Sequence, residues 1–240
     1  MPEDFFAGRV SERYDETSAE MFAPEAVEPV VDFLADLAGG GAALELGIGT
    51  GRIALPLARR GVRVHGIDLS PDMVAQLRAK PGGDEIPVTI GDFATTKVDG
   101  TFAIAYVVFN AIMNLRTQDA QIACFGNVAA HLDPQGLFVV EVMLPELRRL
   151  PPGETLLPFE VSSEHLGFAE YDVAHQGLIS HHYYPGESEY GTFPGRYVWP
   201  SELDLMARIA GMSLRERWSG WRREAFTSES TKHVSVWQKS

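Results

Sequence analysis

Three acidic residues, Glu45, Asp68 and Asp92, follow one another at intervals of 23 and 24 residues. Each interval has about the length of one strand, one helix and their connections, and each acid lies at the end of a run typical of a buried strand. The carboxyl ends of parallel strands meet at one edge of a sheet, which is where open α/β sheets bind ligands. We therefore expect the three carboxylates to converge on one ligand site.

A glycine-rich segment follows the first acid, with Gly47, Gly49 and Gly51 at alternate positions. Such a turn after a first strand usually places an anion or a nucleotide at a helix N-terminus. Arg52 stands where a dinucleotide fingerprint needs its third glycine, and no Lys-Ser or Lys-Thr pair follows to form a P-loop. Because Glu45 would repel a pyrophosphate, the loop favours a ligand that carries an ammonium or sulfonium group.

The acids and the glycine loop lie in a regular alternation of predicted strands and helices. Helices are expected at residues 24–38, 52–60, 70–80 and 117–132, and strands at 42–46, 62–67, 87–90, 102–109 and 136–143. Strands that alternate with helices through short loops predict right-handed crossovers and a parallel sheet. The expected fold is a Rossmann-like, doubly wound α/β domain with a mostly parallel seven-stranded sheet.

The pattern changes after Pro145, where residues 145–199 contain several prolines and short alternating stretches but no long helical period. These residues predict an antiparallel β insertion after the fifth strand. A helix at 200–210 and strands at 213–218 and 233–239 then complete the sheet. The expected organisation is an N-terminal helical segment (1–38), a core (39–144), the insertion (145–199) and a C-terminal part of the core (200–240).

The composition restricts the class of partner and the compartment. Thirty-three acidic side chains against 20 basic ones give a net charge of −13, which argues against nucleic acid as a partner. A single cysteine, Cys124, allows no intrachain disulfide and suits a reducing cytoplasm. The first residues lack the features of a signal peptide, and the longest uncharged run, 101–115, is too short to span a membrane. We expect a cytoplasmic protein, with a homodimer left open.

Three motifs together resemble the class I S-adenosylmethionine-dependent methyltransferases: Glu45 to Gly51, Gly66 to Ser70, and Gly91-Asp92-Phe93. The resemblance covers residues 42–145 well and both ends loosely. The Tyr14-Asp15 pair is similar to the N-terminal segment that folds over the cofactor in small-molecule members, notably the amino-sugar N-methyltransferases of antibiotic pathways. The insertion is similar to theirs in placement.

The resemblance implies S-adenosylmethionine as cofactor and S-adenosylhomocysteine as product. It implies that the glycine loop approaches the methionine end, that Asp68 holds the ribose and that Asp92 reads the adenine. The expected cofactor-binding residues are Tyr14, Glu45, Gly47, Gly49, Gly51, Arg52, Asp68, Leu69, Met73, Asp92, Phe93, Phe109 and Asn110.

The sequence assigns no catalytic group, and five residues stand as candidates: Tyr14, Asn110, Glu141, His175 and His182. Asn110 is equally interpreted as a helix cap, and Glu141 as a buried, partnered carboxylate. No metal site is expected, because adjacent residues such as His181 and His182 point to opposite faces of a strand.

The substrate is expected to contact Asn114 and the loop between the last two strands, at 219–232. We expect this loop to lie over the edge where the acids converge, with Trp221 and Phe226 covering the acceptor and Arg222 or Arg223 meeting an anionic group on it. The alternative is a solvated hairpin loop that only connects the two strands.

The predicted reaction is an in-line displacement of the cofactor's methyl group by an oxygen, nitrogen or carbon atom of a small, secondary-metabolite-like molecule. Such a transfer needs alignment and exclusion of water more than covalent catalysis. Two alternatives use the same fold: an enzyme that binds the cofactor but catalyses a cyclisation or rearrangement, and a binding protein that senses the cofactor.

Overall fold

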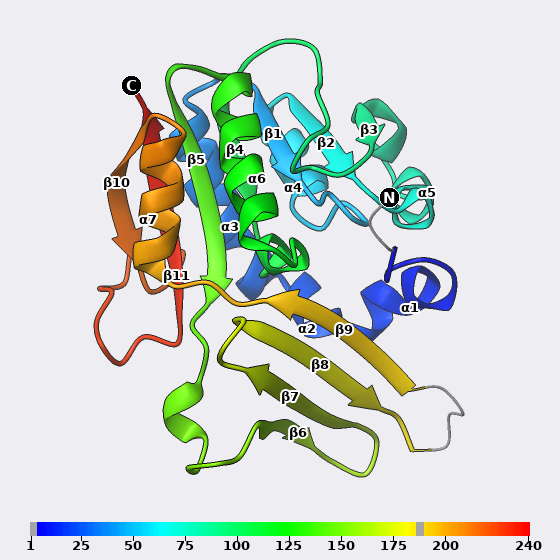
Figure 1. Ribbon diagram of the computed structural model, residues 1–240. Helices are drawn as coiled ribbons and strands as arrows, with labels where there is room; N and C mark the ends of the chain where they lie inside the picture. Colours follow the sequence, from blue (N-terminus) through cyan, green and yellow to red (C-terminus); the bar gives the residue numbers. More distant parts are fainter. Residues whose placement is uncertain (1–3, 186–189) are drawn as a thin grey trace.

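The structure is a computed structural model that describes residues 4–185 and 190–240. Its main sheet contains the strands β1 (Ala43–Leu46), β2 (Val64–Asp68), β3 (Val88–Ile90), β4 (Phe102–Val107), β5 (Leu132–Met143), β10 (Met212–Trp218) and β11 (Lys232–Lys239). They are ordered β10-β11-β5-β4-β1-β2-β3, and β11 is antiparallel to both of its neighbours while the strands from β5 to β3 are parallel. The mostly parallel seven-stranded sheet expected from the sequence is confirmed (Figure 1).

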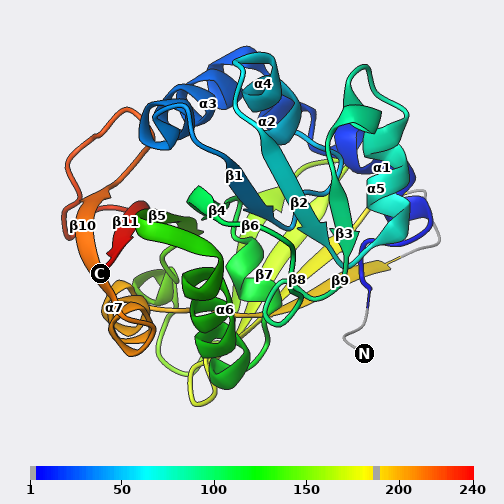
Figure 2. The ribbon, with the colours of Figure 1, turned by 90° about the horizontal axis from the view of Figure 1, so that it is seen from above.

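Helices cover both faces of this sheet (Figure 2). One face carries α3 (Pro24–Ala38), α4 (Ala54–Arg59) and α5 (Pro71–Arg78), and the other carries α6 (Gln118–His131) and α7 (Pro200–Ile209). Each face has its own apolar core. Two helices begin where the sequence places a cap: Ser70 Oγ accepts from the Met73 N–H, and Thr117 Oγ1 accepts from the Ala120 N–H.

Short segments connect these elements, and two short N-terminal helices close the carboxyl edge of the sheet. Helices α1 (Arg9–Thr17) and α2 (Ala19–Phe22) lie across that edge, and three 3₁₀ turns are η1 (Gly83–Glu85), η2 (Ala111–Asn114) and η3 (Leu147–Arg149). The Gly8 N–H donates to Asp72 Oδ2 at 2.7 Å, which fastens the start of α1 to α5. The N-terminal segment is thus attached to the edge where the sequence places the ligand.

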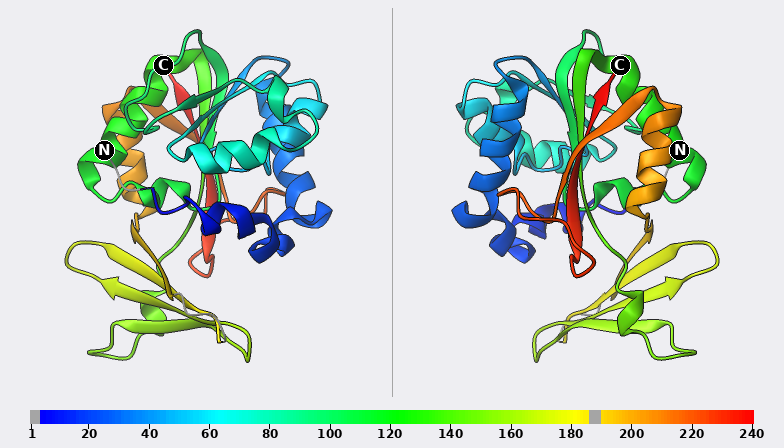
Figure 3. Two further views of the ribbon diagram at one scale, coloured as in Figure 1. Left: turned by 90° about the vertical axis from the view of Figure 1, so that its right-hand side faces the viewer. Right: turned by 90° about the vertical axis from the view of Figure 1, so that its left-hand side faces the viewer.

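The insertion forms a separate four-stranded antiparallel sheet, ordered β6-β7-β8-β9, that projects beyond the carboxyl edge (Figure 3). Its strands are β6 (Leu156–Val161), β7 (Leu166–Asp172), β8 (Gly177–Tyr183) and β9 (Tyr190–Arg196). The antiparallel insertion is confirmed. The alternating stretches in the sequence lie at 160–163, 169–173 and 179–184, and none of them predicts β9. Its Gly191, Pro194 and Gly195 are residues that weaken a strand pattern.

Among the helices within residues 4–185 and 190–240, none has the length and apolar character needed to cross a membrane.

Candidate functional site

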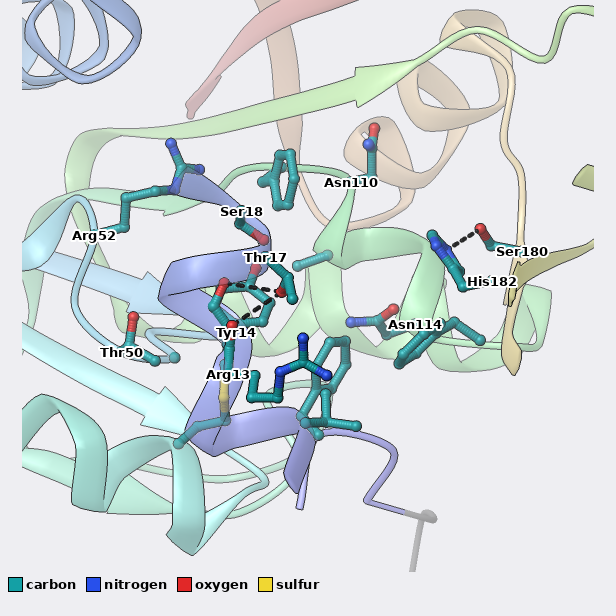
Figure 4. Close-up of a pocket in the computed structure, with 18 of the residues that line it drawn as sticks. Arg13, Tyr14, Thr17, Ser18, Thr50, Arg52, Asn110, Asn114, Ser180 and His182 are labelled. Carbon is teal, nitrogen blue, oxygen red and sulfur yellow. Dashed lines mark hydrogen bonds between the residues drawn. The ribbon is translucent and has the colours of Figure 1, made fainter. Parts of the chain in front are cut away.

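The carboxyl edge of the main sheet opens into a cavity of about 1100 Å³ that lies between the glycine loop, α1 and the insertion. This volume exceeds the usual range of about 300–1,000 Å³ for a pocket that binds one small ligand. Figure 4 shows Tyr14, Thr50 and Arg52 on one side of the pocket, and Ser180 with His182 on the other. The cavity therefore offers two different walls and room for two ligands.

The glycine loop forms one wall. Gly47 and Gly49 line the cavity with φ angles of 74° and 54°, in the left-handed region that favours glycine. Gly51, with φ of 81°, does not line the cavity, and a Cβ there would clash with Leu77 Cδ1 of α5. The first two glycines leave bare backbone facing the cavity, and the third allows the loop to pack closely on α5.

Asp68 ends β2 and fixes the loop. Its Oδ2 accepts from the Gly49 N–H at 2.6 Å and its Oδ1 accepts from the Ser70 N–H at 2.9 Å. Burial raises the pKa of this carboxyl group, and the two backbone donors counteract the shift. Each oxygen keeps a further lone pair, so Asp68 can accept from a ligand while it holds the loop.

Glu45 lies deeper, at the end of β1, and also lines the cavity. The Tyr106 hydroxyl, on the neighbouring strand β4, donates to Glu45 Oε2 at 2.9 Å. Burial raises the pKa of Glu45 to about 8, against an ordinary value of 4.5. The carboxyl group is therefore mostly protonated at neutral pH and presents less negative charge than its residue type suggests.

Helix α1 packs over the glycine loop. The Thr50 hydroxyl donates to Asp15 Oδ1 at 2.6 Å, and Lys80 forms an ion pair with the same carboxylate. Tyr14 lines the cavity between Arg52 and Asp68, and burial raises the pKa of its phenol. The structure thus places the Tyr14-Asp15 pair over the glycine loop, as the sequence predicts.

Other predicted cofactor residues divide into two groups. Met73, Phe109 and Asn110 line the cavity, whereas Leu69, Asp92 and Phe93 do not. Asp92 Oδ1 accepts from the Ala94 N–H at 2.8 Å, and Phe93 is buried in the core with its ring edge close to Gly47. Asp92 and Phe93 follow β3, which lies beyond β2 in the sheet, and Phe93 reaches back to the glycine loop.

The insertion supplies the opposite wall, and several of its side chains escape sequence reasoning. Alternate residues of β8, Leu178, Ser180 and His182, face the cavity together with His165 and Phe193. Of these, only His182 is among the site residues expected from the sequence. The signal available in the sequence is the two-residue period of β8, which predicts which residues share a face but not which face is inward.

A hydrogen-bonded chain runs along this wall. His165 Nε2 lies 3.0 Å from His182 Nδ1, and His182 Nε2 lies 2.8 Å from Ser180 Oγ. Burial, then the neighbouring His165 and His181, lowers the pKa of His182 to about 4. At neutral pH the ring is therefore uncharged, with one nitrogen donating and the other accepting. His181 points to the other face and contacts Glu170 Oε2 at 2.9 Å.

Two further candidates, His175 and Glu141, lie outside the cavity lining. His175 is exposed in the turn between β7 and β8, pairs with Asp172 and does not line the cavity. Glu141 is buried on β5 outside the cavity lining, with Trp221 Nε1 donating to its Oε1 at 3.0 Å. Asn114, the predicted substrate contact on η2, lines the cavity.

The structure corrects the placement of Trp221 and Arg223. Their loop begins and ends at the carboxyl edge, but it turns onto α3 and not over the cavity. Trp221 packs edge-on against Phe33 with ring centroids 5.4 Å apart, and Arg223 lies 4.7 Å from the same ring and pairs with Asp36. Neither residue lines the cavity, because the aromatic and acidic side chains of α3 provide a closer partner.

No group of three or more histidine, cysteine, aspartate or glutamate side chains in the described part of the chain is arranged to hold a metal ion.

Comparisons with known proteins identify the class of cofactor. A family model described as a methyltransferase domain matches residues 43–136. The putative methyltransferase YqeM of Bacillus subtilis (strain 168) is 30% identical over 110 residues, which are 45% of this chain and 44% of that protein. This match therefore spans less than half the length of the curated relative.

Two solved structures match nearly the whole chain. The CcbJ methyltransferase from Streptomyces caelestis is 33% identical, with a TM-score of 0.87 over 99% of this chain and 100% of that one. CalS10, an amino pentose methyltransferase from Micromonospora echinaspora solved with S-adenosylmethionine bound, is 21% identical. Its TM-score is 0.71 over 98% of each chain, so it shares the fold.

The residues at the carboxyl edge fit S-adenosylmethionine. Because Gly49 has no side chain, the space between the loop and Met73 stays open for a ligand. A Cβ on Gly49 would enter this space, 3.4 Å from Met73 Cε. Asp68 offers acceptor oxygens that suit hydroxyl groups, and its acidic character suits a cationic sulfonium. The chain belongs to the class I S-adenosylmethionine-dependent methyltransferase family.

Proposed function

We propose that this methyltransferase transfers its methyl group to an amino nitrogen of a small molecule that binds beneath the insertion. The observation that carries the proposal is the charge of the cavity wall. Apart from Glu45, the acidic residues that line it outnumber the two basic ones: Glu16, Glu20, Asp68, Glu160 and Glu164, against Arg13 and Arg52. A cavity of this charge attracts a cationic amine and disfavours a carboxylate or a phosphate.

S-adenosylmethionine would bind against the glycine-loop wall of the cavity. The residues that would hold the cofactor there are Tyr14, Glu45, Gly47, Gly49, Arg52, Asp68, Met73, Phe109 and Asn110. Asp68 would accept from the ribose hydroxyls. Asp92 and Phe93, which flank the loop, would read and cover the adenine. Gly51 and Leu69 would shape this wall without direct contact.

When bound, the cofactor supplies an electrophilic methyl group on a sulfonium. The chain's own residues then have to orient the acceptor and exclude water. The insertion and α1 would act as the cover, since Phe6, just before α1, packs against Phe193 of β9 with ring centroids 5.7 Å apart. The described parts of the N-terminal segment and of the insertion, residues 4–38, 145–185 and 190–199, would therefore enclose the acceptor between them.

The chain of Ser180, His182 and His165 would contact the amine. A neutral His182 adds no positive charge that would repel a cationic acceptor, and it can polarise the Ser180 hydroxyl. The amine attacks the methyl group as its neutral form, so the proton of a cationic acceptor would leave to solvent before the transfer, and His182, with its low pKa, would act as a hydrogen-bond partner and not as the base. Asn114, on η2, would supply a further polar contact. The bound molecule would be sugar-like, since CalS10, which shares the fold, is an amino pentose methyltransferase.

Matched pairs of acceptors test the proposal. We would incubate the protein with S-adenosylmethionine and amino sugars, each paired with the same sugar bearing a hydroxyl in place of the amino group, and measure S-adenosylhomocysteine release. We expect release with amino members and an N-methyl product by mass spectrometry. Turnover of the hydroxyl members alone would reject the nitrogen acceptor.

A further inference from the structure

The turn that follows β4 contains two consecutive non-glycine residues in the left-handed region. Phe109 has a φ of 54° and Asn110 a φ of 62°. Residues with a side chain adopt this conformation only where their surroundings hold them in it. Both residues line the cavity, and the Arg52 guanidinium lies 5.1 Å from the centroid of the Phe109 ring. This turn is thus a constrained part of the cofactor wall.

Strand β5 holds the turn in place. The Phe109 N–H donates to Glu141 Oε2 at 3.0 Å, and the Asn110 N–H donates to the backbone oxygen of Glu141 at 3.4 Å. In return, the Met143 N–H donates to Asn110 Oδ1 at 2.7 Å. The side chain of Glu141 is itself held from a third part of the chain.

That third part is the C-terminal hairpin. Glu141 Oε1 accepts from the Trp221 indole N–H at 3.0 Å and from Lys232 Nζ at 3.4 Å. Trp221 is 9% exposed and packs on α3, so its position is fixed independently of the cavity. A single buried carboxylate therefore joins the anchored hairpin to the constrained turn.

We propose that Glu141 is a positioning residue that holds the Phe109–Asn110 turn in its cofactor-binding conformation, and that Trp221 fixes the orientation of Glu141. The proposal rests on the assignment of the cofactor to the glycine-loop wall and is independent of the acceptor. The chemical basis of the proposal is that both carboxylate oxygens of Glu141 accept hydrogen bonds. A glutamine of the same shape would turn an NH₂ group toward a donor on one side.

Calorimetry with S-adenosylhomocysteine tests this, because it needs no acceptor. We expect Glu141→Gln to weaken binding at least tenfold and Trp221→Phe by no more than about threefold. The double variant should bind at least threefold more tightly than Glu141→Gln alone. Loss of the indole N–H leaves on that side only the half-exposed Lys232 ammonium, which can turn to solvent, so the carboxamide can turn its oxygen to Phe109. A purely structural role would instead make the two losses add.

Trp218 provides the matched control, because it lies in the same hairpin and its indole donates to Glu216 at 2.7 Å. Trp218→Phe should not rescue Glu141→Gln. Binding by Glu141→Gln within twofold of wild type, or a Glu141→Gln/Trp221→Phe variant weaker than Glu141→Gln, would overturn the proposal. Failure of binding in the wild-type protein would instead reject the cofactor assignment itself.

Amide hydrogen exchange covers the case in which Glu141→Gln does not fold. In Trp221→Phe, which keeps an aromatic ring on α3, the Phe109 amide should exchange at least threefold faster than in wild type. The amides within β4 should be unchanged. Equal Phe109 exchange in the two proteins would contradict the proposed link.

Discussion

The glycine-loop wall and the insertion wall face the same cavity but are built by different means. The first consists of backbone and strand-end carboxylates, and its central contacts, from Asp68 to the Gly49 and Ser70 amides, lie within 20 residues in sequence. The second consists of side chains such as His165 and His182, which the strand register of a separate sheet brings together. Both pairs are fewer than 20 residues apart, 19 for Gly49 and Asp68 and 17 for His165 and His182, so the two walls differ in their material and not in their sequence separation. Backbone amides and strand-end carboxylates form the first, and side chains of an antiparallel sheet form the second.

This difference separates the two ligands. In the wall formed by the glycine loop and Asp68, few residues can change without loss of cofactor binding. A wall of alternate strand residues can change one side chain at a time, because its strands pair through their backbones. We infer that the insertion sets the choice of acceptor, and four variants examine that division, from the largest expected effect to the smallest.

Asp68→Ala should have the largest effect, on the cofactor wall alone. Loss of a hydrogen bond to a charged group corresponds to roughly 1.5–3 kcal/mol, or about 10- to 150-fold in affinity. We expect weaker S-adenosylhomocysteine binding by calorimetry in a folded protein. Asp84→Ala, at an exposed acid in η1, is the control and should bind as wild type does. An unchanged dissociation constant for Asp68→Ala would remove it from the ribose site.

The raised pKa of Glu45 predicts that the stability of the protein depends on pH. This pKa is about 8 in the folded protein against an ordinary 4.5, so the folded state binds more protons than the unfolded state between these values. The free energy of unfolding therefore falls as pH rises through this window, by up to about 1.4 kcal/mol per unit. Urea unfolding at pH 6 and pH 7 should show this fall in wild type and a smaller one in Glu45→Gln. Identical falls in both proteins would show that Glu45 does not titrate there.

His182→Ala tests the insertion wall. Loss of one neutral hydrogen bond is worth about 0.5–1.5 kcal/mol, which is roughly 2- to 12-fold. We expect kcat/KM for the amine acceptor to fall by that factor, while S-adenosylhomocysteine affinity stays at the wild-type value. His175→Ala, which changes an exposed histidine of the same sheet, should alter neither quantity. A loss of cofactor affinity in His182→Ala would break the division between the walls.

Arg223→Ala should have the smallest effect. Arg223 is partly exposed and pairs with Asp36 on α3, away from the cavity, and surface ion pairs contribute about 0–1 kcal/mol to stability. Both ligand affinities should remain within about 0.5 kcal/mol of wild type. A raised acceptor KM would return this loop to the substrate site.

The same contrast explains what the sequence could predict. The spacing of Glu45 and Asp68 reflects one strand–helix unit, so the α/β fold and most of the loop wall were predictable. The β9 strand, with Pro194, and the inward face of β8 depend on which strands pair, and a single sequence does not carry that information.

The hairpin shows a further limit. Its direction and its place at the carboxyl edge follow from the strand order, but the attachment of Trp221 to Phe33 and Glu141 does not. Two buried partners from distant segments decide where the loop packs. Local pattern gives no signal for either one.

A crystal structure with S-adenosylhomocysteine and an N-methylated amino sugar tests the central claim most directly. We predict the homocysteine sulfur beside the Phe109–Asn110 turn, the ribose hydroxyls on Asp68, and the methylated nitrogen between that sulfur and the wall formed by Ser180 and His182. An amino sugar bound instead against Trp221 and Arg223, with the insertion wall empty, would contradict the account.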